Sequence, residues 1–252
     1  MSALAGDFWE TLPLGNGVRL LHRDGHGLAA FDKPFGVLSH PNASQDEPRA
    51  LLTCRYDKEA QCFRWKAADG TDRQLWLLNR LDSATSGVIL TAASEKLAEA
   101  VREHYAKKQV NKTYQALVFG QPHMHYEFWH DMLAVKNVRG QIRTSLIGNV
   151  PAETRFFLIK HTQKAFLTSL IKLEPRTGRS HQLRVQCAKR HLPNVGDQTY
   201  GDFALNRSFA KVTKNKRLFL HSFETSFTYD FAGQANAFKA SAPLPRDFQQ
   251  MY

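Results

Sequence analysis

Hydrophobic and polar residues alternate along the chain in two different rhythms, which predict a mixture of strands and helices. A continuous apolar run at residues 88–92 follows a turn rich in Ser and Gly, and this pattern is typical of a buried strand. Helical spacing then predicts an amphipathic helix from Ser94, a suitable N-cap, to about Lys108, where two lysines suit a helix C-terminus. The apolar stripe of this helix, which we expect in the core, consists of Leu97, Ala98, Val101 and Tyr105.

Further strands are predicted in the second half of the chain. Residues 112–120 alternate with a period of two, which places Tyr114, Ala116 and Val118 on one face of a strand. This alternation indicates a sheet that is buried on one side. The other strand-like segments are residues 153–159, 165–173 and 218–222.

Gly, Pro and polar residues mark the turns and connections. Asn16 and Gly17 predict a tight hairpin, and the sequence Lys-Pro-Phe-Gly at residues 33–36 predicts a turn, because Pro fixes one dihedral and Gly permits a positive φ. Residues 42–73 are polar and mixed in charge, so we expect a surface connection there, with a short helix near residues 49–56. The remaining expected connections are a hairpin loop over residues 122–150 and a basic linker over residues 207–217.

Composition and charge narrow the class of protein. A chain of 252 residues with 42% hydrophobic residues can bury a sizeable core, as one large domain or two small ones. Its formal net charge of +11 favours an acidic partner, with nucleic acid first, although a basic surface can also serve only to keep a protein soluble. A membrane surface is disfavoured, since we find no basic amphipathic helix with a large apolar face.

Cysteine usage and the N-terminal sequence favour a reducing compartment. Cys54, Cys62 and Cys187 are an odd number of cysteines without a CxxC spacing, which argues against a disulfide scaffold. Residues 1–14 lack the positive-then-apolar layout of a secretory signal. No apolar run approaches the roughly 18 residues of a membrane span. We therefore expect a cytoplasmic location.

The stretch from Asn79 to Gly87, Asn-Arg-Leu-Asp-Ser-Ala-Thr-Ser-Gly, is the first candidate site. Arg80 and Asp82 bring a guanidinium and a carboxylate within two residues of each other, in a small-residue turn backed by the predicted strand. Ser, Thr and Gly supply local hydrogen bonds and permissive dihedrals, so such a turn can hold a reactive group. The alternative is an ordinary Asp whose side chain hydrogen-bonds the backbone of its own turn.

The second candidate site is the stretch of residues 174–185, in which a Gly-bearing turn leads into Arg and His at an expected helix start. Hydrogen-bond donors and positive charge at that position suit a phosphate or a carboxylate, although Arg184 alone would read as a surface residue. The clustered histidines His123, His125 and His130 suggest a metal, but no acidic or Cys partner has a recognised ligand spacing. We therefore expect no metal.

These stretches resemble, in the same order, the motifs of the RluA-type RNA pseudouridine synthases. The first candidate site is similar to the family's His-Arg-Leu-Asp-x-x-Thr-Ser-Gly motif and departs from it at Asn79, where the family has His. The second resembles Thr-Gly-Arg-x-His-Gln-Ile/Leu-Arg at every fixed position. The resemblance covers residues 26–248. Further matches are the turn Lys33-Pro34-x-Gly36, the strand Lys112-x-Tyr114-x-Ala116, the segment Pro193-x-x-Gly196-Asp197-x-x-Tyr200-Gly201 and the strand Leu220-His221-Ser222.

The resemblance implies a fold and a domain organisation. We expect an α/β (α+β) pseudouridine-synthase fold, with a mixed, largely antiparallel central sheet and with flanking helices and loops around a central cleft. The catalytic domain would take residues 26–252, behind an N-terminal arm of residues 1–25. This arm is shorter than the RNA-binding S4 module that many relatives carry.

The resemblance also implies an activity, the isomerisation of uridine to pseudouridine in tRNA or rRNA, and a role for each matching residue. Asp82 is expected to be the reactive carboxylate, Arg184 the cation that pairs with it, and Tyr114 a ring against the extracted base. Neither a cofactor nor a metal is expected, RNA is the expected partner, no membrane is involved, and the enzyme is expected to be a monomer. The residues expected to contact RNA are Arg80, Arg179, His181, Leu220 and Lys33.

Two other functional classes compete with this interpretation. A non-catalytic RNA-binding or ribosome-assembly factor would have the same charge, and the Asn79 departure favours it. The presence of Asp82, Tyr114 and Arg184 together argues for chemistry instead. A metal-dependent nuclease or phosphoesterase would need clustered carboxylates, which we do not find in the sequence.

Overall fold

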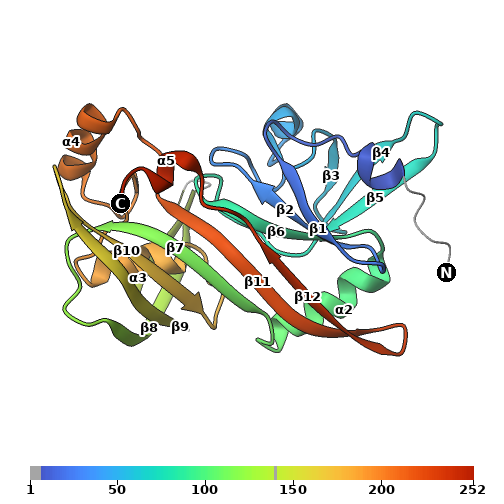
Figure 1. Ribbon diagram of the computed structural model, residues 1–252. Coiled ribbons are helices and arrows are strands. Elements are labelled where there is room, and N and C mark those ends of the chain that lie inside the picture. The colour runs from blue at the N-terminus through green and yellow to red at the C-terminus, as the bar shows by residue number, and fades with distance from the viewer. Residues whose placement is uncertain (1–6, 139–140) are drawn as a thin grey trace. The chain divides into compact units, whose positions relative to one another are not determined.

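The computed structural model describes residues 7–138 and 141–252, and the chain folds into two compact units (Figure 1). Unit 1 comprises the described residues up to Val110 together with Glu224–Ala242, and unit 2 comprises Asn111–Phe223 with Pro243–Tyr252. We expected one catalytic domain over residues 26–252. Residues 7–25, which we expected to form a separate arm, belong to unit 1, since Phe8 and Trp9 are buried and the strand that follows pairs within this unit.

Unit 1 is built on antiparallel strands with one long helix. Its strand order is β3-β4-β5-β6-β11, with β12 paired to β11 and with β2 paired to both β1 and β6. Of β11, the residues from Glu224 on belong to this unit. The core between sheet and helix contains Leu90, Leu97, Val101 and Phe227. The bounds are α1 (Asp7–Glu10), β1 (Arg19–Arg23), β2 (Leu28–Lys33), the 3-10 helix η1 (Ser44–Arg49), β3 (Arg55–Asp57), β4 (Cys62–Lys66), β5 (Asp72–Leu77), β6 (Ser86–Ala92), α2 (Glu95–Ala106), β11 (Leu220–Phe231) and β12 (Gln234–Ser241).

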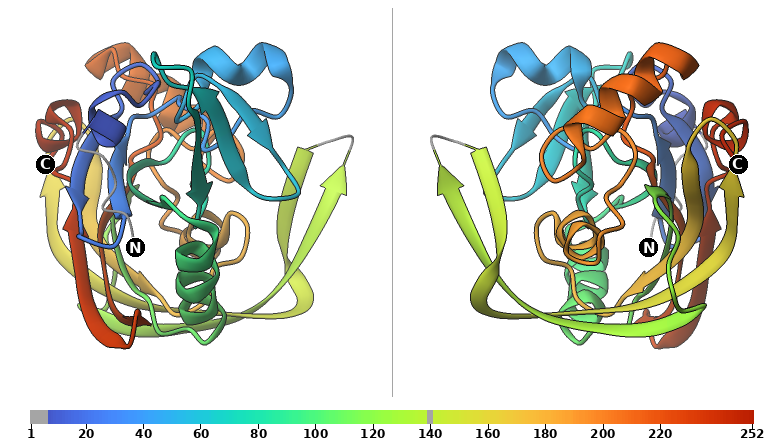
Figure 2. Two further views of the ribbon diagram at one scale, coloured as in Figure 1. Left: turned by 90° about the vertical axis from the view of Figure 1, so that its right-hand side faces the viewer. Right: turned by 90° about the vertical axis from the view of Figure 1, so that its left-hand side faces the viewer.

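Unit 2 contains the antiparallel strands β7-β10-β9-β8, in this order, with helices beside them. Figure 2 shows the long β8–β9 hairpin curling around the side on which α3 lies. On this side Leu133 and Ala152 of the hairpin pack against Val185 of α3. The bounds are β7 (Asn111–Phe119), β8 (Tyr126–Val138), β9 (Gln141–Gln163), β10 (Leu167–Pro175), α3 (Gln182–Lys189), α4 (Phe203–Thr213) and α5 (Arg246–Gln249).

Local sequence explains the elements that were predicted. Strand β6 is buried along its whole length, as its continuous apolar run indicates. Helix α2 begins after Ser94, whose hydroxyl accepts a hydrogen bond from the Leu97 amide at 3.3 Å. Gly36 in the Lys-Pro-Phe-Gly turn has a φ of +87°, which is the conformation that requires glycine there. The predicted class, a largely antiparallel α/β fold with flanking helices, is confirmed.

Three predicted connections are wrong. Residues 42–73 contain η1, the strands β3 and β4 and the start of β5, and the expected helix over residues 49–56 is absent apart from Arg49, the last residue of η1. Arg55, Arg64 and Lys66 on these short strands gave the segment the polar character of a surface connection. The described part of the expected hairpin loop contains strand β8 and the first part of β9, so a hairpin is present but consists of long paired strands rather than a loop. Residues 207–217 fall largely in α4, which Asp202 caps through the amides of Ala204 and Leu205, each at 2.9 Å.

No helix among the described residues combines the length and the apolar character that crossing a membrane would require.

Candidate functional site

Asp82 lies in unit 1 on the turn between β5 and β6, and its side chain is half-buried. The Asp82 carbonyl accepts a hydrogen bond from the Thr85 amide at 3.0 Å, which closes the turn. The preceding residue is held by Ser39, whose hydroxyl donates to the Leu81 carbonyl at 2.7 Å and accepts from the Leu81 amide at 2.9 Å. The backbone on both sides of Asp82 is therefore held by hydrogen bonds, which fixes the position of this carboxylate.

Lys33 also supports the turn that carries Asp82. Its side chain is fully buried, and its ammonium donates to the carbonyls of Val37 at 2.7 Å, Pro34 at 3.1 Å and Ser83 at 3.2 Å. The amide of Gly36 also donates to Ser83, at 2.8 Å, so the Lys-Pro-Phe-Gly turn and the Asp82 turn are tied together. The ammonium of Lys33 thus holds two turns together. The RNA contact that we expected of Lys33 stays a prediction.

Asn79, the departure from the family motif, also braces the turn. Its Oδ1 accepts a hydrogen bond from the Leu90 amide of β6 at 2.7 Å, and the neighbouring Leu78 amide donates to the Leu90 carbonyl at 3.0 Å. Asn79 therefore ties the start of the turn to the buried strand β6. Arg80, the next residue, is exposed.

We predict that Asn79→Ala lowers the free energy of unfolding by about 1–3 kcal/mol, because the buried Leu90 amide loses its acceptor. Denaturant unfolding followed by circular dichroism measures this change. Asn79→His, which restores the family's residue, serves as the comparison and should retain most of the activity. An unchanged unfolding free energy in Asn79→Ala would show that this hydrogen bond does not support the turn.

In unit 2, Arg184 of α3 forms a buried ion pair with Asp197. The Arg184 Nε donates to Asp197 Oδ2 and Nη2 donates to Oδ1, both at 2.8 Å, and the two side chains are only 8% and 1% exposed. Burial raises the pKa of the Asp197 carboxyl, but the hydrogen bonds and the positive charge of Arg184 outweigh burial and hold this pKa below its usual range. This bidentate geometry fixes the plane of the Arg184 guanidinium.

Tyr200 and His181 complete this cluster. The guanidinium carbon of Arg184 lies 5.2 Å from the centre of the Tyr200 ring. The Tyr200 hydroxyl lies 2.8 Å from Nδ1 of His181 and accepts a hydrogen bond from the Thr144 amide at 2.9 Å. His181 itself has a left-handed backbone with a φ of +54°, at the position that precedes α3. The turn before α3 is thus held to the β9 strand through Tyr200.

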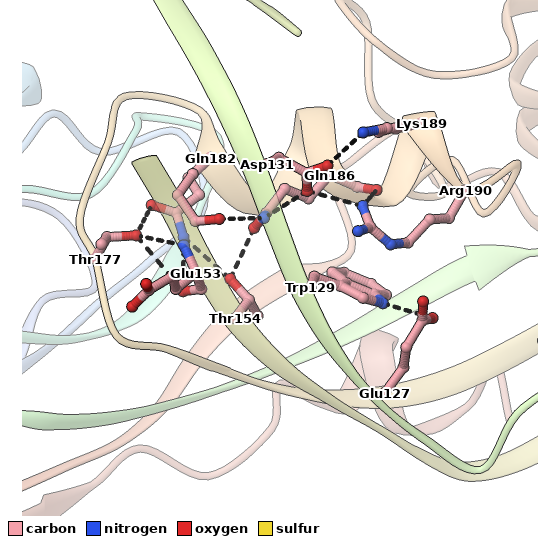
Figure 3. Close-up of polar contacts among 11 residues, drawn as sticks. Glu127, Trp129, Asp131, Glu153, Thr154, Thr177, Gln182, Gln186, Lys189 and Arg190 are labelled. Atoms are coloured by element: carbon pink, nitrogen blue, oxygen red, sulfur yellow. Dashed lines mark hydrogen bonds and ion pairs between the residues drawn. The ribbon is translucent and has the colours of Figure 1, made fainter. Parts of the chain in front are cut away.

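A buried polar network fixes α3 against the β8–β9 hairpin (Figure 3). Its first part ties the helix start to β9: the Thr177 hydroxyl donates to Gln182 Oε1 at 2.7 Å, and Gln182 Nε2 donates to the Thr154 hydroxyl at 3.0 Å. The Thr154 hydroxyl in turn donates to Gln186 Oε1 at 2.7 Å. Because Gln182 and Gln186 lie one turn apart on either side of Arg184 in the sequence, this network sets the rotation of the helix that carries Arg184.

The second part of the network centres on Asp131 of β8. This buried carboxylate accepts from Gln186 Nε2 at 2.8 Å, from Lys189 at 2.6 Å and from Arg190 at 3.0 Å. Burial raises the pKa of Asp131, but the hydrogen bonds of Lys189, Gln186 and Arg190 outweigh it, so the carboxyl stays ionised. Arg190 also lies over the buried Trp129 ring, at 4.4 Å from its centre. The end of α3 is therefore pinned to the hairpin.

The other predicted residues of unit 2 lie on β7, in the turn before α3 and at the start of β11. Tyr114 is partly buried on β7, where it pairs across to Leu173 of β10. Arg179 is exposed, and its Nε donates to the Pro151 carbonyl at 3.2 Å. Leu220 is buried at the start of β11.

The structure thus gathers Arg184 and His181 into one cluster, and it holds Arg80, Asp82 and Lys33 on the turns of unit 1. The pairing of Arg184 with Asp82 joins residues of different units and stays a prediction. Sequence reasoning did not assign Asp197 or Tyr200 a role, although the Gly-Asp-x-x-Tyr-Gly motif that carries them was recognised. Among the described residues, no group of three or more His, Cys, Asp or Glu side chains is arranged to hold a metal ion.

Comparison with known proteins identifies the class. A family model described as RNA pseudouridylate synthase matches residues 27–189 of this chain. The chain is 33% identical over 236 residues to the ribosomal large subunit pseudouridine synthase C of Salmonella typhi, covering 92% of this chain and 68% of that protein. It is 30% identical over 228 residues to the tRNA pseudouridine synthase C of Pasteurella multocida (strain Pm70), covering 86% of this chain and 88% of that protein.

Among solved structures, human RNA Pseudouridylate Synthase Domain Containing 1 matches with a TM-score of 0.68 at 21% identity, covering 91% of this chain and 84% of the human chain. This match supports the fold. The fold and the motif-bearing turns together define an isomerase that modifies RNA. Within that class, the chain belongs to the RNA pseudouridylate synthase family, whose members convert uridine to pseudouridine.

Proposed function

We propose that this enzyme isomerises specific uridines in tRNA or rRNA and that Asp82 is the residue on which the reaction depends. The observation that carries this proposal is the Arg-Leu-Asp-x-x-Thr-Ser-Gly turn, in which Ser39, Lys33 and Asn79 hold the backbone around a half-buried carboxylate. The relatives named for ribosomal large subunit RNA and for tRNA support these two RNA classes as substrates.

The reaction requires no oxidant or reductant. The bond between N1 of uracil and C1′ of ribose breaks, the base turns, and a bond forms between C5 and the same C1′. The proton that leaves C5 is balanced by the proton that N1 gains. Asp82 serves either as a nucleophile or as a base at the sugar, and both roles need the ionised carboxylate.

In this proposal Arg184 keeps Asp82 ionised and aimed, because a neighbouring guanidinium favours the charged form of a carboxyl group and holds it by charge-assisted hydrogen bonds. The target uridine is flipped out of its stack, at a cost of a few kcal/mol. The Tyr114 ring stacks on the extracted base, its hydroxyl can carry a proton, and Leu220 supplies an apolar surface on the other side.

RNA binding is assigned to cations near these motifs. Arg80 takes the place that the flipped base leaves or holds a phosphate, and Arg179, His181 and the basic residues of α4 contact the backbone. Such contacts release counterions, so binding should weaken steeply with added salt. The proposal includes action as a monomer in the cytoplasm, a reducing compartment that suits the free thiols of Cys54, Cys62 and Cys187.

Pseudouridine mapping tests the proposal. The purified protein is incubated with unmodified tRNA transcripts and with rRNA transcripts, and the products are sequenced for pseudouridine. RNA from cells that lack the protein is mapped in parallel. New pseudouridine at one or a few sites of one RNA class, absent from the same sites in the deficient cells, is the expected result. Failure to form pseudouridine in either RNA class would overturn the proposal.

A further inference from the structure

Lys112 is a cation beside the candidate site to which no role has been given. It lies on β7 two residues before Tyr114, so the two side chains share one face of the strand. Its Nζ lies 3.8 Å from the position that a Cβ on Gly178 would occupy, within the Thr-Gly-Arg motif. Lys112 is partly buried there. The ammonium therefore sits between the Tyr114 strand and the turn that leads to α3.

The structure supplies this ammonium with no counter-charge in the described residues. Among the groups around it, only burial shifts the pKa of Lys112, and burial lowers that pKa to about 8. A desolvated cation without an anionic partner is unfavourable, since buried charges in proteins are as a rule paired. An arrangement of this kind fits a site whose anion arrives with a ligand.

The surrounding charged groups do not provide that anion. Tyr114 pairs directly with Leu173 of β10, so Lys112 shares the face of Leu173, whereas Glu174 alternates to the opposite face. Glu174 is moreover engaged by Lys172 at 2.9 Å. The turn residues on either side of Gly178, Arg176 and Arg179, are both cations. The charged residues of the Thr-Gly-Arg turn therefore supply no anion for Lys112.

We propose that Lys112 binds a phosphate group of the RNA substrate, next to the nucleotide that stacks on Tyr114. This inference rests on the proposed function and extends it, because it assigns a substrate contact to the Lys of the Lys-x-Tyr strand. The phosphate supplies the negative charge that the ammonium lacks. It also favours the protonated form of the lysine, so RNA binding takes up a proton when the pH is above the pKa of Lys112 in the free protein.

Two variants and a matched control test the binding role. Oligouridylate serves as the probe, and its dissociation constant is measured from pH 6.5 to 9.5 for Lys112→Met, Lys112→Arg and Lys172→Met, which removes a lysine from the opposite face of the same sheet. Lys112→Met should weaken binding about tenfold or more at pH 7, and Lys172→Met by less than about twofold. The slope of log affinity against log salt should decrease by about 0.7 in Lys112→Met.

The pH dependence separates a bound lysine from a structural one. Wild-type affinity should fall by up to about tenfold per pH unit above pH 8, as the ammonium of Lys112 in the free protein loses its proton. This fall should be absent in Lys112→Arg, which stays charged, and in Lys112→Met, which has no titrating group at position 112. Lys112→Met should also raise the melting temperature at pH 7, because it removes a desolvated charge, while a lysine with a structural role would lower it when removed.

A chemical footprint identifies which part of the RNA is bound. Lys112 is acetylated at pH 8 with a limiting amount of acetic anhydride, and the modified peptide is quantified in the presence of oligouridylate, inorganic phosphate or uridine. Protection by oligouridylate and by phosphate, but not by uridine, is the expected result. Protection by uridine alone, or equal affinities of Lys112→Met and Lys172→Met, would overturn the assignment. If wild type makes pseudouridine while Lys112 stays unprotected, only this inference fails; if wild type makes none, the proposed function fails.

Discussion

Asp82→Asn should abolish pseudouridine formation, with a fall in rate of about 10⁴-fold or more, while the protein still folds and binds RNA. The substitution keeps the shape of the side chain and removes the charge that a nucleophile or a base needs. The turn around residue 82 should keep its shape, because the Thr85 amide, the Ser39 hydroxyl and the Lys33 ammonium donate to the backbone carbonyls of residues 82, 81 and 83, which the substitution leaves in place. Single-turnover assays with excess enzyme measure the chemical step directly.

The control for Asp82→Asn is Asp69→Asn, a substitution of an exposed carboxylate in another turn of unit 1, 56% exposed and paired loosely with Arg73 at 3.8 Å. It should leave activity within about twofold of wild type, since exposed ion pairs contribute little. Filter binding and a thermal melt accompany both variants. Substantial turnover by Asp82→Asn would show that this carboxylate is not the reactive group, and loss of folding would point to a structural role instead.

How much of the fold could be predicted depends on how clearly each segment alternates. Strand β6 and helix α2 carry strong periodic patterns with a recognisable cap, and both formed where expected. Strands β3 and β4 lie where Arg55, Arg64 and Lys66 fill the exposed positions of short strands, so charge obscured the pattern. Helix α4 has few buried residues, and its polar face resembled a linker. Tertiary packing decides whether such segments become strands, helices or connections, and a pattern within one short segment does not contain that information.

The candidate site was predictable where a motif fixes a residue and not where a partner comes from elsewhere in the chain. Asp82, Tyr114 and Arg184 could be named from their motifs. The position of Lys33 could not, because only the folded structure encloses its ammonium among the carbonyls of two turns. Asp197 follows a Gly in a motif of its own, and no local pattern shows that it pairs with an Arg thirteen residues earlier.

These partners matter because they set what the named residues can do. An Arg side chain on a short helix such as α3 can adopt many rotamers, and the helix itself can rotate. Both motions need to be restricted for the guanidinium to keep one orientation. Asp197 limits the side chain, and the network through Thr154, Gln186 and Asp131 limits the helix itself. The rigidity of Arg184 therefore has two sources that can be removed separately.

Asp197→Asn should destabilise the protein by about 3–5 kcal/mol, because it leaves the buried Arg184 guanidinium without its carboxylate. The folded-state pKa of Asp197 is depressed, so its contribution is present at neutral pH and is lost as the pH falls below the ordinary carboxyl value of about 3.9 towards the folded pKa. The difference in unfolding free energy between wild type and Asp197→Asn should therefore shrink in acid. Urea unfolding at a series of pH values measures it.

A double variant separates stability from catalysis at this pair. Arg184→Met combined with Asp197→Leu replaces a buried ion pair by apolar side chains, an exchange that is often neutral or stabilising, so it should recover most of the stability lost in Asp197→Asn. Pseudouridine formation should stay absent, because the guanidinium proposed to act on Asp82 is gone. If the double variant recovers activity together with stability, Arg184 serves only the fold. If Asp197→Asn unfolds at the same urea concentration as wild type at pH 7, the ion pair does not stabilise unit 2.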